Sequence, residues 1–112
     1  MTKEIGERVI CAAIWYDDGI HRPHLPKNII SGIVVGGWRH PNCMVALSEL
    51  LYPNWQTDTL QNQLRISVLN KEVQGFLTSK GRFLDRKYAA WLHKENGGEL
   101  NFTDELFSED LY

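Results

Sequence analysis

The stretch that decides the fold is Gln74–Lys87, which reads QGFLTSKGRFLDRK. We predict that it begins as a strand, turns at Lys80-Gly81, and enters a helix capped by Asp85. Arg82 lies just before this helix, and Arg86-Lys87 lies in its first turn. Because a helix N-terminus carries a partial positive charge, cations there are unfavourable unless an anion lies over the helix end. We therefore expect a phosphate-bearing ligand here, the alternative being a solvated basic turn.

The composition is that of one compact domain. The chain has 112 residues, of which 43% are hydrophobic and 12 are aromatic, enough for a packed core. Its net charge is −2, but residues 1–98 carry 12 Lys/Arg against 9 Asp/Glu, whereas residues 99–112 carry five acids and no base. This charge is too small for a protein that coats duplex nucleic acid, and a small anionic ligand fits better. The acidic, aromatic tail 99–112 is expected either to dock across a partner subunit or to fold back over its own core.

The two cysteines, Cys11 and Cys43, do not form a disulfide framework, so reduced thiols are expected. The N-terminus lacks an apolar signal region, and no apolar run reaches the length of a membrane span. The sequence therefore predicts a soluble protein of the cytoplasm that has no membrane partner.

The first half of the chain predicts two strands and a loop. Val9–Tyr16 is a continuous apolar run, typical of a strand buried on both faces, and Asp17-Asp18-Gly19 closes it with a turn. Two prolines make His21–Lys27 an irregular loop. A second strand is expected over Asn28–Trp38, where Gly36-Gly37 indicates a bulge or a close backbone approach.

Two helices are expected in the rest of the chain. Asn42–Tyr52 carries an apolar stripe at helical spacing and is stopped by Pro53, and Asp85–Asn96 carries a similar stripe and ends at Gly97-Gly98. Segment Asn54–Glu72 fits either a helix or a strand. The predicted class is α+β, with a small antiparallel sheet and two main helices in a single domain over residues 1–112.

A second basic site follows the glycine pair, at Trp38-Arg39-His40. Arg39 can place paired N–H donors on a phosphate, and His40 can donate to an oxygen or read a ring nitrogen. The alternative is that Arg39 caps an acidic neighbour and that His40 is a loop histidine with its hydrogen bonds satisfied.

Metal binding and catalysis are alternative roles for the polar residues. His21-x2-His24 and His40-x2-Cys43 resemble zinc half-sites, but only one of the four ligands is a thiolate, and Cys43 falls on an apolar helix stripe. The chain contains no nucleophile elbow, phosphate-binding lysine loop or dinucleotide fingerprint. We predict binding without turnover, with no metal, cofactor or catalytic residue. The alternatives are an enzyme that degrades a cyclic nucleotide with His40 or His24 as acid or base, and a zinc-stabilised interaction module.

Four blocks together resemble a known family. They are Ile10–Ile14, Gly37–Cys43, Gln74–Arg86 and Phe107–Tyr112, and they leave Asn54–Glu72 uncovered. In this order they resemble the first anti-Thoeris family, phage proteins that sequester a cyclic ADP-ribose immune signal.

The resemblance implies a compact sheet-and-helix protomer that assembles into dimers or hexamers, with a pocket at a subunit boundary. The ligand would be glyco-cyclic ADP-ribose, held and not cleaved, and some relatives also hold cyclic di- or trinucleotides. Carried onto this chain, the phosphate and ribose contacts would be Arg39, Arg82 and Arg86.

The remaining expected ligand contacts come from two of the blocks and from a region that no block covers. Phe76 and Thr78 lie in the third block, and His40 lies in the second. The family also holds the adenine with an aromatic residue and an amide from a variable region. Trp55 and Asn62 are our choices for these two roles, because no motif aligns there.

Overall fold

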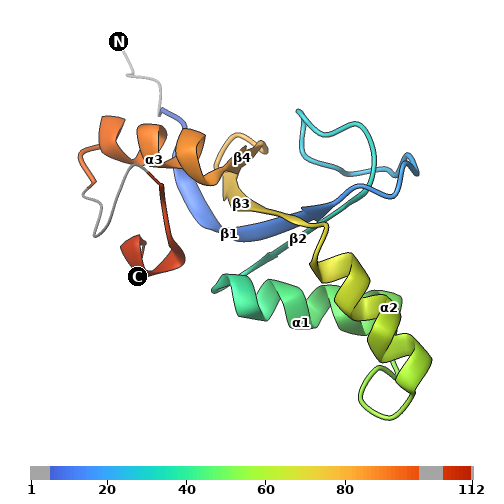
Figure 1. The fold of residues 1–112 in the computed structure, drawn as a ribbon. Coiled ribbons are helices and arrows are strands. Elements are labelled where there is room, and N and C mark those ends of the chain that lie inside the picture. The colour runs from blue at the N-terminus through green and yellow to red at the C-terminus, as the bar shows by residue number, and fades with distance from the viewer. Residues whose placement is uncertain (1–5, 99–104, 112) are drawn as a thin grey trace.

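The computed structural model describes residues 6–98 and 105–111. Four strands form one antiparallel sheet in the order β2-β1-β3-β4 (Figure 1). In chain order the elements are β1 (Val9–Tyr16), β2 (Ile33–Gly37), α1 (His40–Leu51), α2 (Thr59–Leu69), β3 (Val73–Thr78), β4 (Phe83–Asp85), α3 (Arg86–Glu95) and the short 3-10 helix η1 (Ser108–Asp110). The predicted α+β class with a small antiparallel sheet is confirmed, with three α-helices in place of two.

Strand β1 is central, as its apolar run predicts. It pairs with β2 on one side and β3 on the other, and Ala12, Ala13 and Ile14 in its middle have no exposed surface. Its pairing with β3 shifts register between Val9 and Cys11, which marks a bulge near the start of the strand.

The stretch that begins at Gln74 forms a hairpin before it forms the helix. The turn contains Gly81 at φ +76°, and the short strand β4, which the sequence did not predict, lies between this turn and α3. Gly75 pairs with Asp85, and a Cβ on Gly75 would overlap the Leu84 carbonyl oxygen. The predicted cap is confirmed, because Asp85 accepts a hydrogen bond from the Tyr88 N–H at 2.8 Å.

The expected strand over Asn28–Trp38 is too long. Only Ile33–Gly37 forms β2, because Gly32 takes φ +98°, a left-handed conformation that interrupts an extended chain. Gly36 and Gly37 pair regularly with β1 and form no bulge. The close approach is made by α1, since a Cβ on Gly37 would lie 3.2 Å from the Cys43 sulfur.

The helices α1 and α3 pack on one face of the sheet. Cys43 and Leu47 from α1 share a buried cluster with Phe76 from β3 and Ala89 from α3. Segment Asn54–Glu72, which fitted either a helix or a strand, contains the helix α2, whose N-cap is Asp58. Figure 1 shows α1 and α2 extending together to one side, with α3 at the other end of the sheet.

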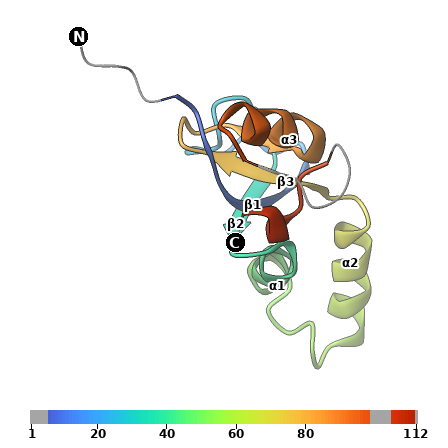
Figure 2. The same cartoon turned by 90° about the vertical axis from the view of Figure 1, so that its left-hand side faces the viewer.

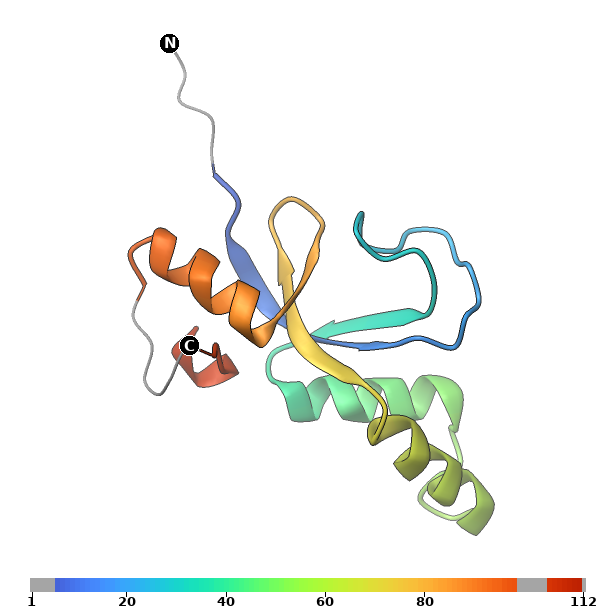
Figure 3. The same ribbon diagram turned by 45° about the horizontal axis from the view of Figure 1, so that its top comes forward.

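The C-terminal tail folds back over its own core. Leu106 is fully buried in the cluster that contains α1 and α3 residues. Figures 2 and 3 both place the C-terminal segment between α3 and the start of α1. Residues 99–104 and 112 of the predicted tail lie outside the described residues. Within the described ranges, no helix combines the length and apolar character needed to cross a bilayer.

Candidate functional site

Arg86, the first residue of α3, is the centre of the site. Its guanidinium is half-buried and donates from Nη1 to the Leu106 carbonyl oxygen at 2.8 Å. Its Nη2 donates to the Gln74 side-chain oxygen and lies 3.3 Å from His40 Nδ1. These three acceptors come from the tail, β3 and α1, and all three are neutral. They orient the guanidinium without neutralising its charge.

His40 is held in one tautomer by its surroundings. The residue is 4% exposed, and the ring Nε2 lies 2.8 Å from the Gly75 carbonyl oxygen. A carbonyl can only accept, so Nε2 carries the hydrogen and Nδ1 is left to accept from Arg86. Desolvation lowers the pKa of His40, and the charge of Arg86 lowers it further against the opposing bond to Gly75. Phe76 supports the ring from the core, edge-on, with centroids 5.1 Å apart.

A cleft of about 230 Å³ opens beside Arg86. The Phe107 ring lies over the guanidinium, with 4.6 Å between Cζ and the ring centroid. The tail therefore forms one wall of the cleft, and α1, β3 and α3 form the others. The lining residues are His40, Pro41, Met44, Gln74, Arg86, Phe107, Ser108 and Glu109.

The cleft places the cation of Arg86 near the carboxylate of Glu109, which also lines it. Desolvation lowers the pKa of Arg86 from its ordinary value, while Glu105 and Glu109 raise it. An arginine stays charged in proteins even so. A half-buried guanidinium whose direct acceptors are neutral gains most from a charged acceptor such as a phosphate or carboxylate.

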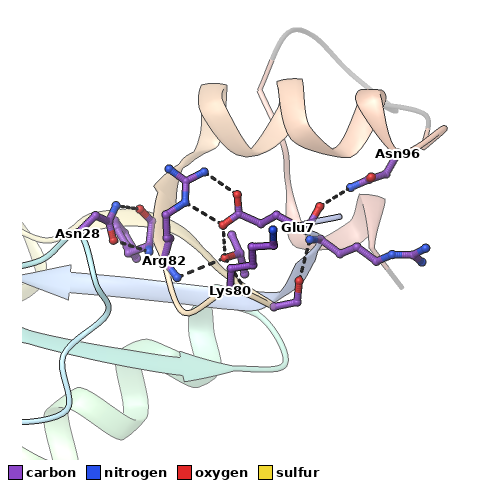
Figure 4. Close-up of polar contacts among 9 residues, drawn as sticks. Glu7, Asn28, Lys80, Arg82 and Asn96 are labelled. Atoms are coloured by element: carbon purple, nitrogen blue, oxygen red, sulfur yellow. Dashed lines mark hydrogen bonds and ion pairs between the residues drawn. The ribbon is translucent and has the colours of Figure 1, made fainter. Parts of the chain in front are cut away.

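Arg82 belongs to a different cluster. Its Nε and Nη2 lie 2.8 and 2.6 Å from the two carboxylate oxygens of Glu7, and Thr78 donates its hydroxyl hydrogen to the same carboxylate at 2.6 Å (Figure 4). The guanidinium also lies over the Tyr88 ring, 5.6 Å from its centroid. The hydrogen bonds from Arg82 and Thr78 lower the pKa of Glu7 to about 2. Glu7 thus occupies the place that we predicted for a phosphate.

The other predicted residues lie outside the cleft. Arg39 is the N-cap residue of α1, next to His40 in the chain, and does not line the cleft. Trp55 and Asn62 lie together near the start of α2, where Arg65 stacks 4.1 Å over the Trp55 ring. Arg65 also donates from Nε and Nη2 to the Asn62 side-chain oxygen at 3.2 and 3.0 Å. Both residues chosen for the adenine are therefore engaged by Arg65 within the chain.

Of the predicted contacts, Arg86 and His40 line the same cleft within one chain. Phe76 has no exposed surface and Thr78 is 4% exposed, and neither lines the Arg86 cleft. Arg86 and Lys87 lie in the first turn of α3, where the helix dipole disfavours cations. Asp85 relieves this, because its carboxylate caps the helix.

Sequence reasoning missed Gln74 and Phe107 as wall residues. Gln74 is two residues from Phe76 and therefore shares its strand face, which is a signal that alternation could have supplied. Phe107 lies in the fourth block of the family resemblance, but no local sequence pattern indicates that its ring packs against Arg86.

Reactive groups near the cleft are held in unreactive forms. Cys43 has no exposed surface, and desolvation raises its pKa to about 11, which disfavours the thiolate. Both nitrogens of His40 are already hydrogen-bonded. Among residues 6–98 and 105–111, no group of three or more His, Cys, Asp or Glu side chains is placed to hold a metal ion.

A family model described as phage T4 y16D protein matches residues 8–112. The match spans most of the chain, which therefore belongs to this family. Comparisons with curated proteins and with solved structures give no match.

Proposed function

We propose that this member of the phage T4 y16D protein family is an anti-defence protein that binds a cyclic nucleotide immune signal and holds it uncleaved. The first candidate ligand is glyco-cyclic ADP-ribose, followed by cyclic di- and trinucleotides. The observation that carries the proposal is Arg86, a half-buried guanidinium with neutral acceptors beside an open cleft. The four-block resemblance to the first anti-Thoeris family supports the ligand class.

The surroundings of Arg86 suit the capture of a phosphate. His40, Gln74 and the Leu106 carbonyl hold the guanidinium in place before any ligand arrives, which lowers the entropy cost of binding. Each charge-assisted contact with a phosphate contributes on the order of 1.5–3 kcal/mol. Phe107 adds an aromatic surface at the same cleft.

The size of the cleft supports a shared site between chains. Its volume of about 230 Å³ is below the roughly 300–1,000 Å³ of pockets that bury a drug-sized ligand. A two-phosphate nucleotide would fit only in part. We therefore include a homo-oligomer, dimer or hexamer, in the proposal, with Arg39 of a second copy completing the site.

Retention without cleavage is supported by the state of the nearby groups. A general acid or base needs a nitrogen or oxygen free to exchange a proton with the ligand, and the His40 nitrogens are both engaged. The raised pKa of Cys43, together with its burial, disfavours a cysteine nucleophile. The competing function is degradation of a cyclic nucleotide by His40 or His24.

The experiment is to incubate the protein with glyco-cyclic ADP-ribose, denature it by heat, and analyse the released nucleotide by mass spectrometry. We expect intact ligand at a fixed ratio to protein, even with excess ligand. A linear or hydrolysed product that keeps accumulating would overturn retention and favour the enzyme. Zinc analysis of the same sample tests the interaction-module alternative.

Two variants locate the site. Arg86→Ala should weaken binding by at least about tenfold, which corresponds to about 1.4 kcal/mol. Lys87→Ala, an exposed cation in the same helix turn, is the matched control and should bind like the unaltered chain. Equal affinity for both variants in titration calorimetry would remove Arg86 from the site.

A further inference from the structure

A second cavity, of about 510 Å³, lies on the other face of the sheet. Successive side chains on a strand point to opposite faces, so Leu77 faces away from the cluster that holds Phe76. Leu77 lines this cavity and the Arg86 cleft lies on the Phe76 side. The lining residues are Ile10, Cys11, His24, Leu25, Pro26, Lys27, Val34, Leu77, Thr78 and Gly81.

The floor of the cavity is apolar sheet surface. Leu77 and Val34 come from β3 and β2, and the bulge in β1 lets the adjacent residues Ile10 and Cys11 both face it. Ile10 is 56% exposed, although its neighbours at the centre of β1 are fully buried. This surface gains free energy when an apolar group covers it.

One wall of the cavity, residues 24–27, is fixed to the β3–β4 hairpin. The Lys27 N–H donates to the Gly81 carbonyl at 2.8 Å. The next residue, Asn28, donates to the Phe83 carbonyl at 2.5 Å and accepts from the Phe83 N–H at 2.8 Å (Figure 4). Because the wall is held by these bonds, the cavity is formed before any ligand enters, as is usual for small-molecule sites.

The rim of the cavity carries positive charge. The Lys27 stem runs over Gly81, since a Cβ there would lie 3.7 Å from Lys27 Cε, and both residues line the cavity. His24 lies in the same wall and takes φ +64°, a conformation that costs free energy for a residue with a side chain. None of the lining residues in the described part of the chain is acidic.

We propose that this cavity binds a small amphiphilic anion, with its apolar or aromatic body on the sheet floor and its carboxylate, sulfonate or phosphate at Lys27. The volume lies within the range of single small-molecule pockets. The site is independent of Arg86 and of the function proposed for the other face.

Cys11 offers a local readout, because its thiol lines the cavity and is half-buried whereas Cys43 is fully buried. The test measures the rate of Cys11 alkylation by iodoacetamide with increasing 2-naphthoate, and mass spectrometry identifies the labelled cysteine. 2-Naphthamide, which has the same rings without the charge, is the ligand control. We expect 2-naphthoate to slow the labelling of Cys11 at least fivefold and saturably, and 2-naphthamide to slow it much less.

Variants test whether the protection of Cys11 comes from a ligand bound at Lys27. Lys27→Glu should abolish the protection, and Lys94→Glu on exposed α3 should keep it. Arg86→Ala should also keep the protection, although it weakens nucleotide binding. If Lys27→Glu does not fold, Lys27→Gln serves instead and should weaken protection. Equal protection by the two naphthyl compounds, or none by either, would overturn the proposal. Protection that rises with protein concentration alone would also overturn it, by showing that a second copy covers this face.

Discussion

The guanidinium of Arg82 and the carboxylate of Glu7 lie 75 residues apart in sequence and form a two-point ion pair, with N–O distances of 2.8 and 2.6 Å. The pair ties the segment before β1 to the β3–β4 turn. A second tie reinforces it, since Asn96 donates to the Glu7 carbonyl oxygen at 3.0 Å.

This pair makes stability depend on acidity. The pKa of Glu7 is lowered from 4.5 to about 2, so its contribution is complete above about pH 4.5 and is lost as the pH falls towards 2. Between pH 6 and pH 3, the melting temperature of the unaltered chain should fall by more than that of Glu7→Gln. Glu95→Gln on exposed α3 should follow the unaltered chain. Identical pH dependence in all three proteins would show that the pair contributes nothing to folding.

His40 should add a second pH dependence near neutrality. Its pKa lies below the ordinary 6.5, so the unfolded chain takes up a proton more readily, and stability falls as the pH drops below about 6.5. His40→Gln, which keeps a donor towards the Gly75 carbonyl, should reduce the difference in unfolding free energy between pH 7.5 and pH 5.5. Urea denaturation at the two pH values measures this difference in unfolding free energy. His21→Gln, in an exposed loop position, should leave the difference unchanged.

Leu106 should anchor the tail and with it one wall of the cleft. The side chain is fully buried, and its truncation to alanine should cost about 2–5 kcal/mol of unfolding free energy. Leu50→Ala, at a position that is 63% exposed, should change stability by no more than about 0.5 kcal/mol. Chemical denaturation compares them, and similar losses for the two variants would mean that the tail does not pack as described.

Gly75 should tolerate no side chain. A Cβ there would overlap the Leu84 carbonyl oxygen, and moving that backbone would break the pairing of β3 with β4. Gly75→Ala should lower the melting temperature strongly or prevent folding. Gly6→Ala is the control, since no atom lies within 4 Å of its added Cβ. A normal melting temperature for Gly75→Ala would contradict the hairpin geometry.

Local signals predicted the parts of the fold that depend on near neighbours. The apolar run of β1, the cap at Asp85 and the stop at Pro53 are each encoded within a few residues, and each appears where expected. Strand β4 was missed because three residues carry no periodicity. The sequence did not distinguish a helix from a strand in the region of α2, because the spacing of its apolar residues suits both. The structure forms the helix, with Asp58 as its N-cap.

The amino-acid sequence by itself determined the α+β class, the central strand and two of the helices, and it singled out Arg86 and His40 as candidate ligand contacts. It did not determine which acceptor each arginine meets. Arg82 and Arg86 are four residues apart and chemically identical, yet one meets Glu7 from the N-terminal segment and the other meets the carbonyl of Leu106 from the tail. That choice depends on which distant segments the sheet and helix α3 bring alongside, so only the tertiary structure decides it.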